Sequence, residues 1–532
     1  PLHGVFEPTT GPALLTPTKE HNPLRKGILK QRVPLVVFDD VVVEEAVAHL
    51  KNAILSVDSP YKRWTGSKVL TRSEALNGVP GDQWIPPMNL HTSPGYPYTN
   101  ANTSKNGKFD FVEGEPGERI LIAEVDERLE KRIAEAKNGV VSMTLFIDIL
   151  KDERVKLSKI ADGKTRIFNV APFDLNMAVR MYFQLFAAHV MHNHVYGECA
   201  VGLNPHSAEW GMMYHHMQHE DAQWIGGDYS NYDKQLSYQL LKAVLEIIDD
   251  FYDDGNERVR ECLFETMFSA FHIAERDVYR VPQGNPPGIV MTSLINSLVN
   301  SLMMRIIYIE LGGSMTTFDD YVRLKTYGDD NIASVMKGAD WFNMVSISRQ
   351  FATHGIVYNQ PNKEAMTEDL KFMDIKDLTF LKRGFREESG KVLAPLSMDS
   401  IHEMVNWIRS SNDDAEATRA NFLAACREMY HHGREAFGRF TSHVYKFAQQ
   451  HAFHLPYTNY VTSGEYWGGE NVGRVNFTGQ STTQLLDDCC DLGNEETLFS
   501  VQSSRAPRKT KAVWQSMCDL LFIALIINTT SN

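Results

Sequence analysis

Two adjacent carboxylates, in the tetrad Tyr327-Gly328-Asp329-Asp330, are the residues of this sequence whose types and spacing most readily suggest chemistry. Strand-like runs flank the tetrad over residues 323–326 and 331–335. Gly-Asp is a favourable turn pair, because glycine accepts a positive φ and aspartate can hydrogen-bond to nearby backbone. We therefore expect a hairpin with two carboxylates at its tip, and such oxygen ligands suit a hard cation such as Mg²⁺. Taken alone, four residues are equally compatible with an acidic surface turn.

A second carboxylate segment precedes this tetrad in the chain. Residues 224–233 have the pattern of a strand that ends at Asp228, followed by a turn to Asp233. Nucleotidyl transfer with two metal ions needs carboxylates from separate segments, which hold the cations about 3.5–4 Å apart. Asp228 and Asp329 can meet if their strands are neighbours in one sheet, and Asp330 would then lie beside them. An aspartate at a strand end is, by itself, more often only a cap.

Basic side chains gather over residues 151–166, where there are six of them against three acidic ones. They alternate with apolar residues, which predicts a β-ribbon with one charged edge. Such an edge could bind phosphate groups, and a solvated charged surface is the alternative.

The loop 282–288 contains three prolines and two glycines, and it makes unusual demands on the backbone. It opens a predicted helix over 292–309, in which Thr292, Asn296 and Asn300 fall on one polar face. A polar stripe against solvent is the alternative for this face. Further helices are predicted over 118–137, 341–354 and 401–453, and a hairpin over 378–393.

The bulk properties limit the class of protein. A chain of 532 residues is long enough for roughly two to four lobes. Its net charge of −14 argues against a basic coat over the whole surface, but it permits a locally basic channel. Six cysteines without a CxxC pair indicate a reducing compartment and no zinc site.

The two ends of the chain have distinct compositions. Residues 1–60 are rich in proline and are basic between positions 19 and 32, which indicates an extended arm laid over another lobe. The first thirty residues contain no apolar run of the kind that a signal peptide needs. The apolar run 520–527 is too short to span a bilayer.

Three segments, in this order, closely resemble motifs A, B and C of viral RNA-dependent RNA polymerases. They are 228–233, 284–288 with 292–296, and 327–330. The resemblance extends to motif F (151–166), motif G (92–98), motif D (362–363), motif E (380–383) and the start of the thumb (401–403 with Trp407). The picornavirus-like group, insect picorna-like viruses among them, is the most similar, over roughly residues 20–470. Eight ordered blocks make a chance match negligible.

The resemblance implies a closed right hand of the α/β (α+β) class, with fingers, a palm of antiparallel sheet flanked by helices, and a helical thumb. The expected divisions are fingers with a fingertip arm over 1–222, palm over 223–380 with a fingers insertion at about 255–288, thumb over 381–475, and a tail of unknown role over 476–532.

The family's metal site carries over onto three carboxylates. The resemblance implies that Asp228 and Asp329 ligate Mg²⁺, with Asp330 as an auxiliary ligand and Mn²⁺ as a possible substitute metal. Lys363 resembles the lysine proposed in the family as general acid to the leaving pyrophosphate. An ordinary lysine is protonated at neutral pH and can donate a proton.

The same resemblance implies that Asp233 and Asn296 read the 2′-hydroxyl of the incoming ribose, with Thr292 supporting them. A hydroxyl both donates and accepts, so a carboxylate with an amide can satisfy it. The chain departs from the family at Pro287, where a serine is usual. Proline lacks both a hydroxyl and an N–H and stiffens the loop, so hydroxyl contacts to RNA do not carry over here.

The resemblance also assigns positions to basic and loop residues. Lys151, Lys159 and Arg166 would contact the triphosphate and the template, and they would stabilise charge that develops on the phosphates. Lys382 and Arg383 would hold the backbone of the primer strand. The full set of expected RNA contacts is Lys382, Arg383, Ser93, Tyr96 and Gly288.

The implied partners are the RNA template and primer strand, nucleoside triphosphates, a genome-linked protein primer and a viral replication complex. The expected location is the host cell cytoplasm, in membrane-associated replication complexes. A membrane contact of the C-terminal tail stays an open alternative to packing in a core or an oligomer.

Two other functions compete with RNA-templated RNA synthesis. A reverse transcriptase shares the palm and a Tyr-x-Asp-Asp tip, but it commonly excludes the 2′-hydroxyl with a bulky side chain, unlike the pair Asp233 and Asn296. A catalytically silent RNA-binding protein would not need carboxylates at every motif position.

Overall fold

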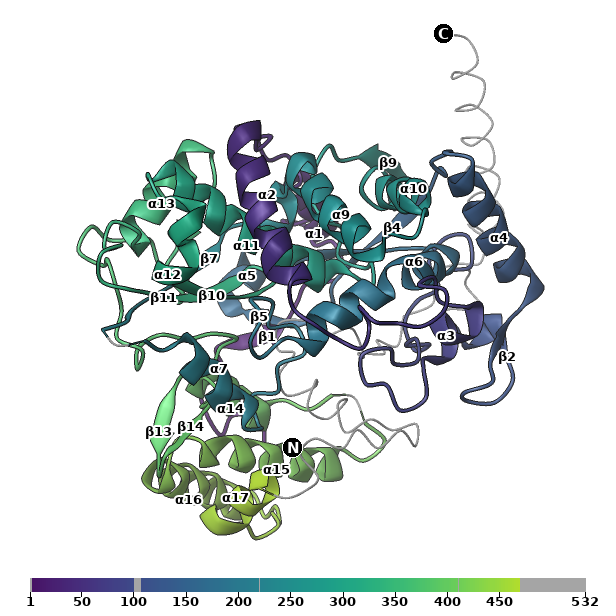
Figure 1. Ribbon diagram of the computed structural model, residues 1–532. Coiled ribbons are helices and arrows are strands. Elements are labelled where there is room, and N and C mark those ends of the chain that lie inside the picture. Colours follow the sequence, from purple (N-terminus) through teal and green to yellow (C-terminus); the bar gives the residue numbers. More distant parts are fainter. Residues whose placement is uncertain (1, 100–106, 220, 410, 469–532) are drawn as a thin grey trace.

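The computed structural model describes residues 2–99, 107–219, 221–409 and 411–468, and it combines antiparallel sheet with many helices (Figure 1). Three groups of elements are apparent, and an N-terminal arm crosses from one to the next. The expected division points stay a prediction, and the tail over 476–532 lies outside the described residues.

The sheet that carries the acidic segments has the strand order β10-β11-β7-β12 and is antiparallel throughout. These strands are β7 (Gln223–Tyr229), β10 (Val322–Tyr327), β11 (Asp330–Val335) and β12 (Tyr358–Asn359). α11 (Thr292–Glu310) packs on β10, and α13 (Met344–Thr353) packs on β7. α11 is buried from residue 294 to residue 308, so a helix rather than solvent covers this face of the sheet.

A second sheet has the order β6-β4-β8-β9, with only β4 and β8 parallel. Its strands are β4 (Leu145–Leu150), β6 (Ile167–Val170), β8 (Phe271–Ala274) and β9 (Asp277–Arg280). α4 (Ala123–Lys137), α6 (Phe173–His192) and α10 (Glu257–Phe268) pack on one another beside it, on the right in Figure 1. The buried face of α4 contains Val125, Leu129 and Ile133, as its helical spacing predicts.

The third group is helical and lies at the bottom of Figure 1. It consists of α14 (Met398–Asn406), α15 (Asp414–Tyr430), α16 (Arg434–Gln450) and α17 (Tyr460–Gly468), with the hairpin of β13 (Arg386–Glu388) and β14 (Lys391–Leu393) beside them. Its apolar core includes Ile401, Phe422 and Phe440, and it also takes in Leu2 and Val5 from the start of the chain.

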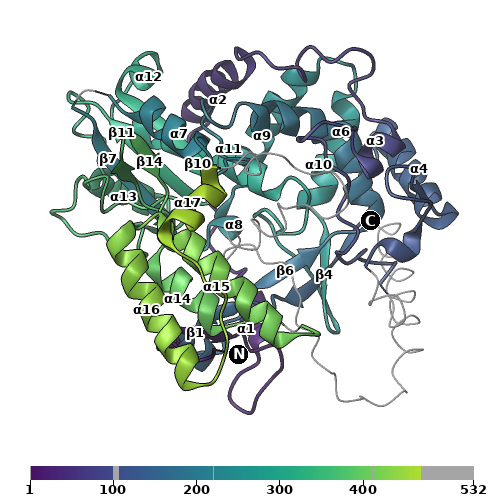
Figure 2. The same cartoon turned by 90° about the horizontal axis from the view of Figure 1, so that it is seen from below.

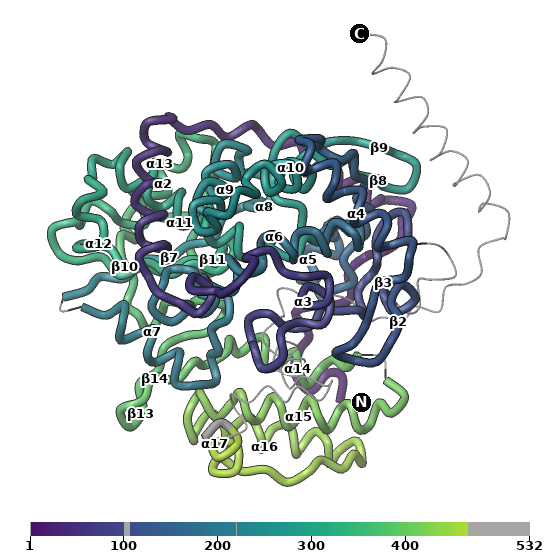
Figure 3. The backbone as a smooth tube through the Cα atoms, turned by 45° about the vertical axis from the view of Figure 1, so that its right-hand side comes forward, coloured from purple at the N-terminus to yellow at the C-terminus, as the bar shows by residue number. Residues whose placement is uncertain are grey.

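The N-terminal arm joins all three groups. After Leu2 and Val5, β1 (Thr10–Pro12) pairs antiparallel with β5 (Arg154–Lys156), and the two strands are labelled next to each other in Figure 1. Figure 2 shows β1 from below, near the start of the chain. α1 (Pro23–Leu29) then packs against β4 and β6. α2 (Asp40–Leu55) ends the arm alongside α9 (Tyr238–Tyr252) and α11, as Figure 3 shows. Residues 2–60 thus lie over the other groups as an arm, but α1 and α2 make part of this arm helical rather than extended.

Most predicted elements are present. The hairpin around residues 328–329 and the helices over 118–137, 292–309 and 341–354 are confirmed within a few residues. The predicted helical span 401–453 is divided into α14, α15 and α16, and the hairpin expected over 378–393 is confined to β13 and β14. The other short elements are α3 (Arg72–Asn77), η1 (Phe109–Phe111), β2 (Val112–Glu113), β3 (Ile120–Leu121), α5 (Leu157–Ala161), α7 (Glu209–Met217), α8 (Tyr232–Gln235), η2 (Met315–Thr317) and α12 (Phe318–Tyr321).

The β-ribbon predicted for residues 151–166 is wrong. Only β5 is a strand in this stretch, and its partner is β1 of the arm rather than a neighbouring segment. α5 follows directly, and β6 then returns to pair with β4. Alternation of charged and apolar residues cannot distinguish one strand edge from a strand that is followed by a short helix.

No single helix in the described ranges is both long and apolar enough to cross a membrane. Judged by length and composition alone, one pair of helical segments, Thr292–Glu310 with Met315–Tyr321, would qualify, but it is bent by 113°.

Candidate active site

The register of the central sheet brings the two acidic segments together. β11 pairs with β7 through Asn331↔Gly227, so the next position along this ladder sets Asp330 opposite Asp228. β10 and β11 close through Tyr327↔Asp330, which leaves Gly328 and Asp329 as a two-residue turn. Carboxylates from two separate segments thus lie at one end of one sheet, as the sequence predicts.

Two glycines make this arrangement possible. Gly328 has a φ of +59°, a conformation that glycine adopts without a steric penalty. Gly227 precedes Asp228, and a Cβ atom there would lie 2.1 Å from the ring of Tyr358. The Tyr358 hydroxyl donates a hydrogen bond of 2.7 Å to Asn331 Oδ1, so this ring packs against the strand that leads to the acidic turn.

The polar face of α11 lies beneath the turn instead of facing solvent. Ser297 Oγ accepts a hydrogen bond of 2.8 Å from Gly328 N, and Asn300 Nδ2 donates one of 3.0 Å to Gly328 O. The Tyr229 hydroxyl donates to Asn300 Oδ1 at 3.1 Å. Because these buried groups satisfy both backbone atoms of Gly328, they hold the turn in one position.

Two adjacent carboxyl groups, those of Asp329 and Asp330, have raised pKa values. Desolvation by the surrounding protein, with the charges of Asp233 and Asp228, raises the pKa of Asp329 to about 6. Burial raises the pKa of Asp330 to about 8, although Leu381 N donates a hydrogen bond of 2.6 Å to its Oδ2. Crowded carboxylates of this kind are the oxygen ligands that Mg²⁺ and Mn²⁺ take, and a cation would relieve their repulsion. Asp228, Asp329 and Asp330 therefore fit a divalent metal site.

Lys363 lies against this acidic group. Its Nζ is 2.9 Å from Asp228 Oδ1, and its side chain is 63% exposed. Burial of part of the side chain disfavours the ammonium, but Asp228 and its acidic neighbours outweigh this and keep the pKa of Lys363 above its usual value. Lys363 therefore carries a proton at neutral pH, next to the carboxylates.

Asp233 and Asn296 are hydrogen-bonded to each other. Asn296 Nδ2 donates to Asp233 Oδ1 at 2.7 Å, and the Tyr232 hydroxyl donates to Asn296 O at 2.7 Å. Burial raises the pKa of Asp233, while the hydrogen bond from Asn296 and the charge of Arg166 oppose this rise. A carboxylate and an amide are thus presented together, which is the combination expected for a ribose hydroxyl.

The expected support from Thr292 takes a different form. Its hydroxyl bonds to the carbonyls of Ile289 at 2.8 Å and Pro286 at 3.2 Å. In the described structure no hydrogen bond joins this hydroxyl to Asp233 or Asn296, which we call the ribose pair. Thr292 therefore braces the loop 282–288 rather than the ribose pair.

The loop before α11 is tied to the second sheet at Pro287 and Gly288. Pro287 O accepts a hydrogen bond of 2.9 Å from Asn169 N. Gly288 has a φ of +149°, and a Cβ atom there would lie only 1.7 Å from Asn169 O. Glycine is therefore obligatory at 288, because the backbones of the loop and of β6 touch.

The basic residues of 151–166 reach the acidic site in part. Arg166 forms a two-point ion pair with Glu153, whose contact between Arg166 Nε and Glu153 Oε1 is 2.6 Å. That pair raises the pKa of Arg166, and the charges of Asp233 and Asp329 add to the effect. Burial lowers the pKa of Lys159, and the positive charge of Lys363 lowers it further. Lys151 Nζ lies 3.9 Å from Glu153 Oε2, so Glu153 organises both Lys151 and Arg166.

Lys382 and Arg383 occupy opposite environments. Lys382 is exposed, and desolvation with the charges of Lys363 and Arg166 lowers its pKa, which places it among the basic residues around the site. Arg383 is 1% exposed, and its guanidinium pairs with Glu428 at 2.9 Å. We therefore withdraw Arg383 from the expected RNA contacts, because its charge is buried in an ion pair.

Ser93 and Tyr96 lie on a loop that is fixed to the start of α6. Phe173 N donates to Pro94 O at 2.8 Å, and a Cβ atom on Gly95 would lie 2.5 Å from Ala171 O. These contacts constrain the loop, and its contact with RNA stays a prediction.

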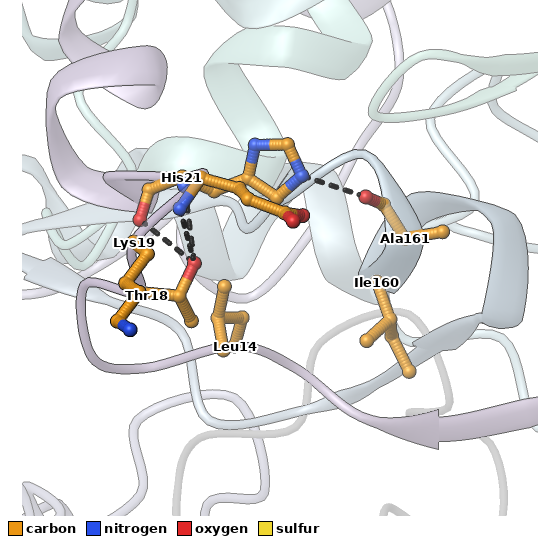
Figure 4. Close-up of a pocket in the computed structure, with 7 residues that line it drawn as sticks. Leu14, Thr18, Lys19, His21, Ile160 and Ala161 are labelled. Atoms are coloured by element: carbon orange, nitrogen blue, oxygen red, sulfur yellow. Dashed lines mark hydrogen bonds between the residues drawn. The ribbon is translucent and has the colours of Figure 1, made fainter.

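A cluster of buried ionisable side chains and a surface hollow contain none of the carboxylates of the acidic site. His206, Glu428 and His431 could hold a metal by their separations, but Arg383 Nη2 lies 3.0 Å from His206 Nε2, and Arg383 also pairs with Glu428, so a positive charge is already present. A hollow between the arm and α5 is lined by Leu14, Thr18, Lys19, Glu20, His21, Ile160 and Ala161, none of which is an expected site residue (Figure 4).

Sequence reasoning missed Glu153 and Asn285 as organising residues of the site. Glu153 is an acidic residue inside a basic stretch, and Asn285 is a polar side chain between Gly284 and Pro286. Each of these residues differs in type from its sequence neighbours, and this difference could have identified it. A residue that breaks a local pattern often contacts a residue of another element.

Comparisons with known proteins agree with this geometry. A family model described as viral RNA-dependent RNA polymerase matches residues 30–450. The replicase polyprotein of Drosophila C virus (strain EB) is 33% identical over 473 residues, which cover 82% of this chain and 26% of the polyprotein. That of acute bee paralysis virus (strain Rothamsted) is 33% identical over 403 residues, with 72% and 21% covered. The chain thus spans about a quarter of the length of these relatives.

Among solved structures, the Sicinivirus 3Dpol RNA dependent RNA polymerase superposes with a TM-score of 0.71 at 19% identity, over 88% of this chain and 93% of that one. The likeness shows the fold, a right hand of mixed helix and sheet. The match of the family model over residues 30–450 shows that the chain belongs to the viral RNA-dependent RNA polymerase family.

Proposed function

We propose that this RNA-directed RNA polymerase copies RNA from nucleoside triphosphates by two-metal-ion nucleotidyl transfer, in the replication of a positive-strand RNA virus. The observation that carries the proposal is the convergence of Asp228, from the strand β7, and Asp329, from the turn between β10 and β11, at one end of the palm sheet. The raised pKa of Asp329 supports it, because a cluster of carboxylates that resists ionisation is suited to a cation.

Asp228, Asp329 and Asp330 would hold Mg²⁺, with Mn²⁺ as a substitute. When bound, such ions activate the attacking 3′-hydroxyl of the growing strand and neutralise charge on the triphosphate. The protein's own part is to fix the three carboxylates on a hairpin and a strand whose backbone is braced by α11.

The ribose of the incoming nucleotide would lie at Asp233 and Asn296. The ionised Asp233 carboxylate accepts a hydrogen bond from a 2′-hydroxyl, and Asn296 keeps that carboxylate in place. A deoxynucleotide offers no such donor, so this pair favours ribonucleotides over the deoxynucleotides that a reverse transcriptase would use.

The triphosphate would lie among basic side chains of the fingers. Arg166 is held by Glu153, and its charge acts on Asp233 and Asp329. The charge of Lys151 also acts to lower the pKa of Asp233, and Lys159 is close enough to Arg166 for that charge to lower the pKa of Lys159. These charges stabilise the negative charge that builds up as the 3′-oxygen attacks the α-phosphorus. Lys363, protonated beside Asp228, would give a proton to the departing pyrophosphate.

The remaining expectations extend this proposal to the strands and the cell. Lys382, with Ser93, Tyr96 and the Gly288 loop, would guide template and primer. Initiation would use a genome-linked protein primer, and synthesis would take place in membrane-associated replication complexes of the host cytoplasm. The similarity to replicase polyproteins supports release of the chain from a longer precursor.

Extension of a short RNA primer on an RNA template, with Mg²⁺ and ribonucleotides, tests the proposal. Asp329→Ala should lower the rate about a thousandfold or more, since several kcal/mol of charge stabilisation are lost. Asp377→Ala is the matched control, because Asp377 is an exposed carboxylate that follows the palm sheet. Full activity in Asp329→Ala, or tight RNA binding without metal-dependent incorporation by the wild type, would contradict the proposal.

A further inference from the structure

Asn285, in the loop before α11, is connected to the ribose pair by a chain of hydrogen bonds. Its Nδ2 donates to Asn296 Oδ1 at 2.8 Å, and Asn296 Nδ2 donates in turn to Asp233 Oδ1 at 2.7 Å. Asn285 and Asn296 are 2% and 5% exposed, so water does not compete freely for these bonds. The backbone of Asn285 contributes as well, because its N–H donates to Asp233 O at 2.8 Å.

The direction of this chain is fixed by Asn285. Its Nδ2 faces two acceptors, Asn296 Oδ1 and Thr292 O, the latter at 3.2 Å. Rotation of the Asn285 amide by 180° would place its oxygen next to Asn296 Oδ1 and Thr292 O. These three oxygens are all acceptors, so no hydrogen bond could form between them. Asn296 must therefore present its oxygen to Asn285 and its N–H groups to Asp233. An Asn296 amide turned the other way would direct an oxygen at the Asp233 carboxylate.

The position of Asn285 has a cost in stability. Among the described residues, none donates a hydrogen bond to its buried Oδ1. A buried acceptor without a donor destabilises the folded state. An apolar side chain would avoid that cost, so the amide is explained by its donor, which orients Asn296, and not by packing.

We propose that Asn285 is a positioning residue for ribose selection, and that it acts through Asn296 on Asp233. The ligand that it serves is a nucleoside triphosphate with a 2′-hydroxyl, so the inference rests on the proposed function. With Asn285 in place, Asn296 donates to Asp233 Oδ1, and the described structure shows no hydrogen bond to Asp233 Oδ2, so a 2′-hydroxyl can donate to that second oxygen. The chain has Pro287 where the family usually has a serine, and Asn285 supplies a polar group to this loop from two positions earlier.

The loop is anchored independently of Asn285. Gly284 N donates to Leu236 O at 2.8 Å, and Gly284 adopts a φ of +104°. Gln283 is clasped by the arm: its Oε1 accepts from Val36 N at 3.2 Å, and its Nε2 donates to Pro34 O at 2.8 Å. Gln283 thus offers a matched control, because it is a buried amide in the same loop that does not touch the ribose pair.

The test compares kcat/KM for ATP and for 2′-deoxy-ATP on one RNA primer–template, in the wild type and in Asn285→Ala. The ratio of the two values should fall about tenfold in Asn285→Ala, the effect of one misdirected hydrogen bond to a charged group, and the fall should come from ATP alone. Asn285→Asp replaces only the side-chain NH₂ group by an oxygen. It should lower the ratio further, because its carboxylate repels Asn296 Oδ1. Gln283→Ala should lower both values together and leave the ratio unchanged.

Each outcome decides the inference. An unchanged ratio in both Asn285 variants overturns it, and so does an equal loss for both nucleotides, which would indicate loop damage. Thermal unfolding identifies a variant that fails to fold, and the near-isosteric Asn285→Asp then decides on its own. A wild type that incorporates neither nucleotide would instead overturn the proposed function, so the two failures are distinguishable.

Discussion

Glu403 Oε1, on thumb helix α14, lies 2.7 Å from the backbone nitrogen of Thr9 in the N-terminal arm. The same oxygen accepts from Thr9 Oγ1 at 2.8 Å and from Thr10 N at 3.0 Å, and the other carboxylate oxygen accepts from Trp407 Nε1 at 2.7 Å. Arg154 of β5 donates to the backbone carbonyl of Glu403 at 3.0 Å. The Glu403 carboxylate therefore holds the N-terminal arm against the thumb. Because β1 of the arm pairs with β5, the same contact also connects β5 to the thumb.

Glu403→Ala should release the arm from the thumb. The change leaves two backbone donors and one hydroxyl of the arm without their acceptor, so we expect the free energy of unfolding to fall by about 2–4 kcal/mol. Thermal unfolding measures this loss, and limited proteolysis should show faster cleavage within residues 2–20. Glu416→Ala, an exposed carboxylate of α15, is the control. Equal resistance to proteolysis in Glu403→Ala and wild type would contradict the role of Glu403.

The contribution of Glu403 should also depend on pH. Burial raises the proton affinity of this carboxyl, but the hydrogen bonds from Thr9 and Thr10 outweigh burial and hold the pKa of Glu403 below its usual 4.5. In acid the unfolded chain then binds a proton more readily than the folded chain, so stability falls as the pH falls below about 4.5. The difference in unfolding free energy between wild type and Glu403→Gln should be full above that pH and shrink below it. Urea titrations at pH 6 and pH 3.5 measure this, and a constant difference would refute it.

Arg383 and Glu428 form a buried ion pair between the palm edge and the thumb, with both side chains 1% exposed. The charge of Arg383 is the main reason that the pKa of Glu428 stays well below its usual value despite burial. Arg383→Met leaves a buried carboxylate without its principal partner, and we expect a loss of about 3–5 kcal/mol in the free energy of unfolding. Lys382→Met should leave stability nearly unchanged and weaken RNA binding at low salt. Denaturant unfolding and RNA titration of the two variants separate these roles, and the reverse pattern would restore Arg383 as an RNA contact.

The positions of the acidic turn, the strand of Asp228 and the helix of Asn296 could be predicted from the sequence. Local rules govern all three: a Gly-Asp turn, a strand that ends in an acid, and helical spacing of polar residues. Their convergence followed from the resemblance to a family, and the register Asn331↔Gly227 supplies the physical reason for it.

The contacts that join distant segments could not be predicted. The partner of β5 is β1, more than a hundred residues earlier in the chain, so the alternation within 151–166 was read as a ribbon. The burial of Arg383 depends on Glu428 of the thumb, and Asn285 acquires its role only when the loop meets α11. Charged and amide side chains have no spacing rule that names a partner from another element, so sequence alone leaves open which of them face solvent.

Substitutions of Lys363 can distinguish a role as a positive charge from a role as a proton donor. Its Nζ is 2.9 Å from Asp228 Oδ1, and its backbone has a φ of +71°, so the turn itself aims the side chain at the acidic site. Lys363→Arg keeps the positive charge but cannot give up a proton near neutral pH, whereas Lys363→Met removes both. If Lys363 is the general acid, the rate of single-nucleotide incorporation should fall about 10²-fold or more in both variants, with KM for the nucleotide raised mainly in Lys363→Met.

Rapid-quench measurement of one incorporation step tests this, because it observes chemistry before release of RNA. Lys376→Met, an exposed lysine after the same palm strands, is the matched control and should react at the wild-type rate. A Lys363→Arg enzyme that reacts at the wild-type rate would show that Lys363 contributes only its charge. In that case the 2.9 Å contact with Asp228 is an ion pair that shapes the acidic site, and the proton for pyrophosphate comes from another donor.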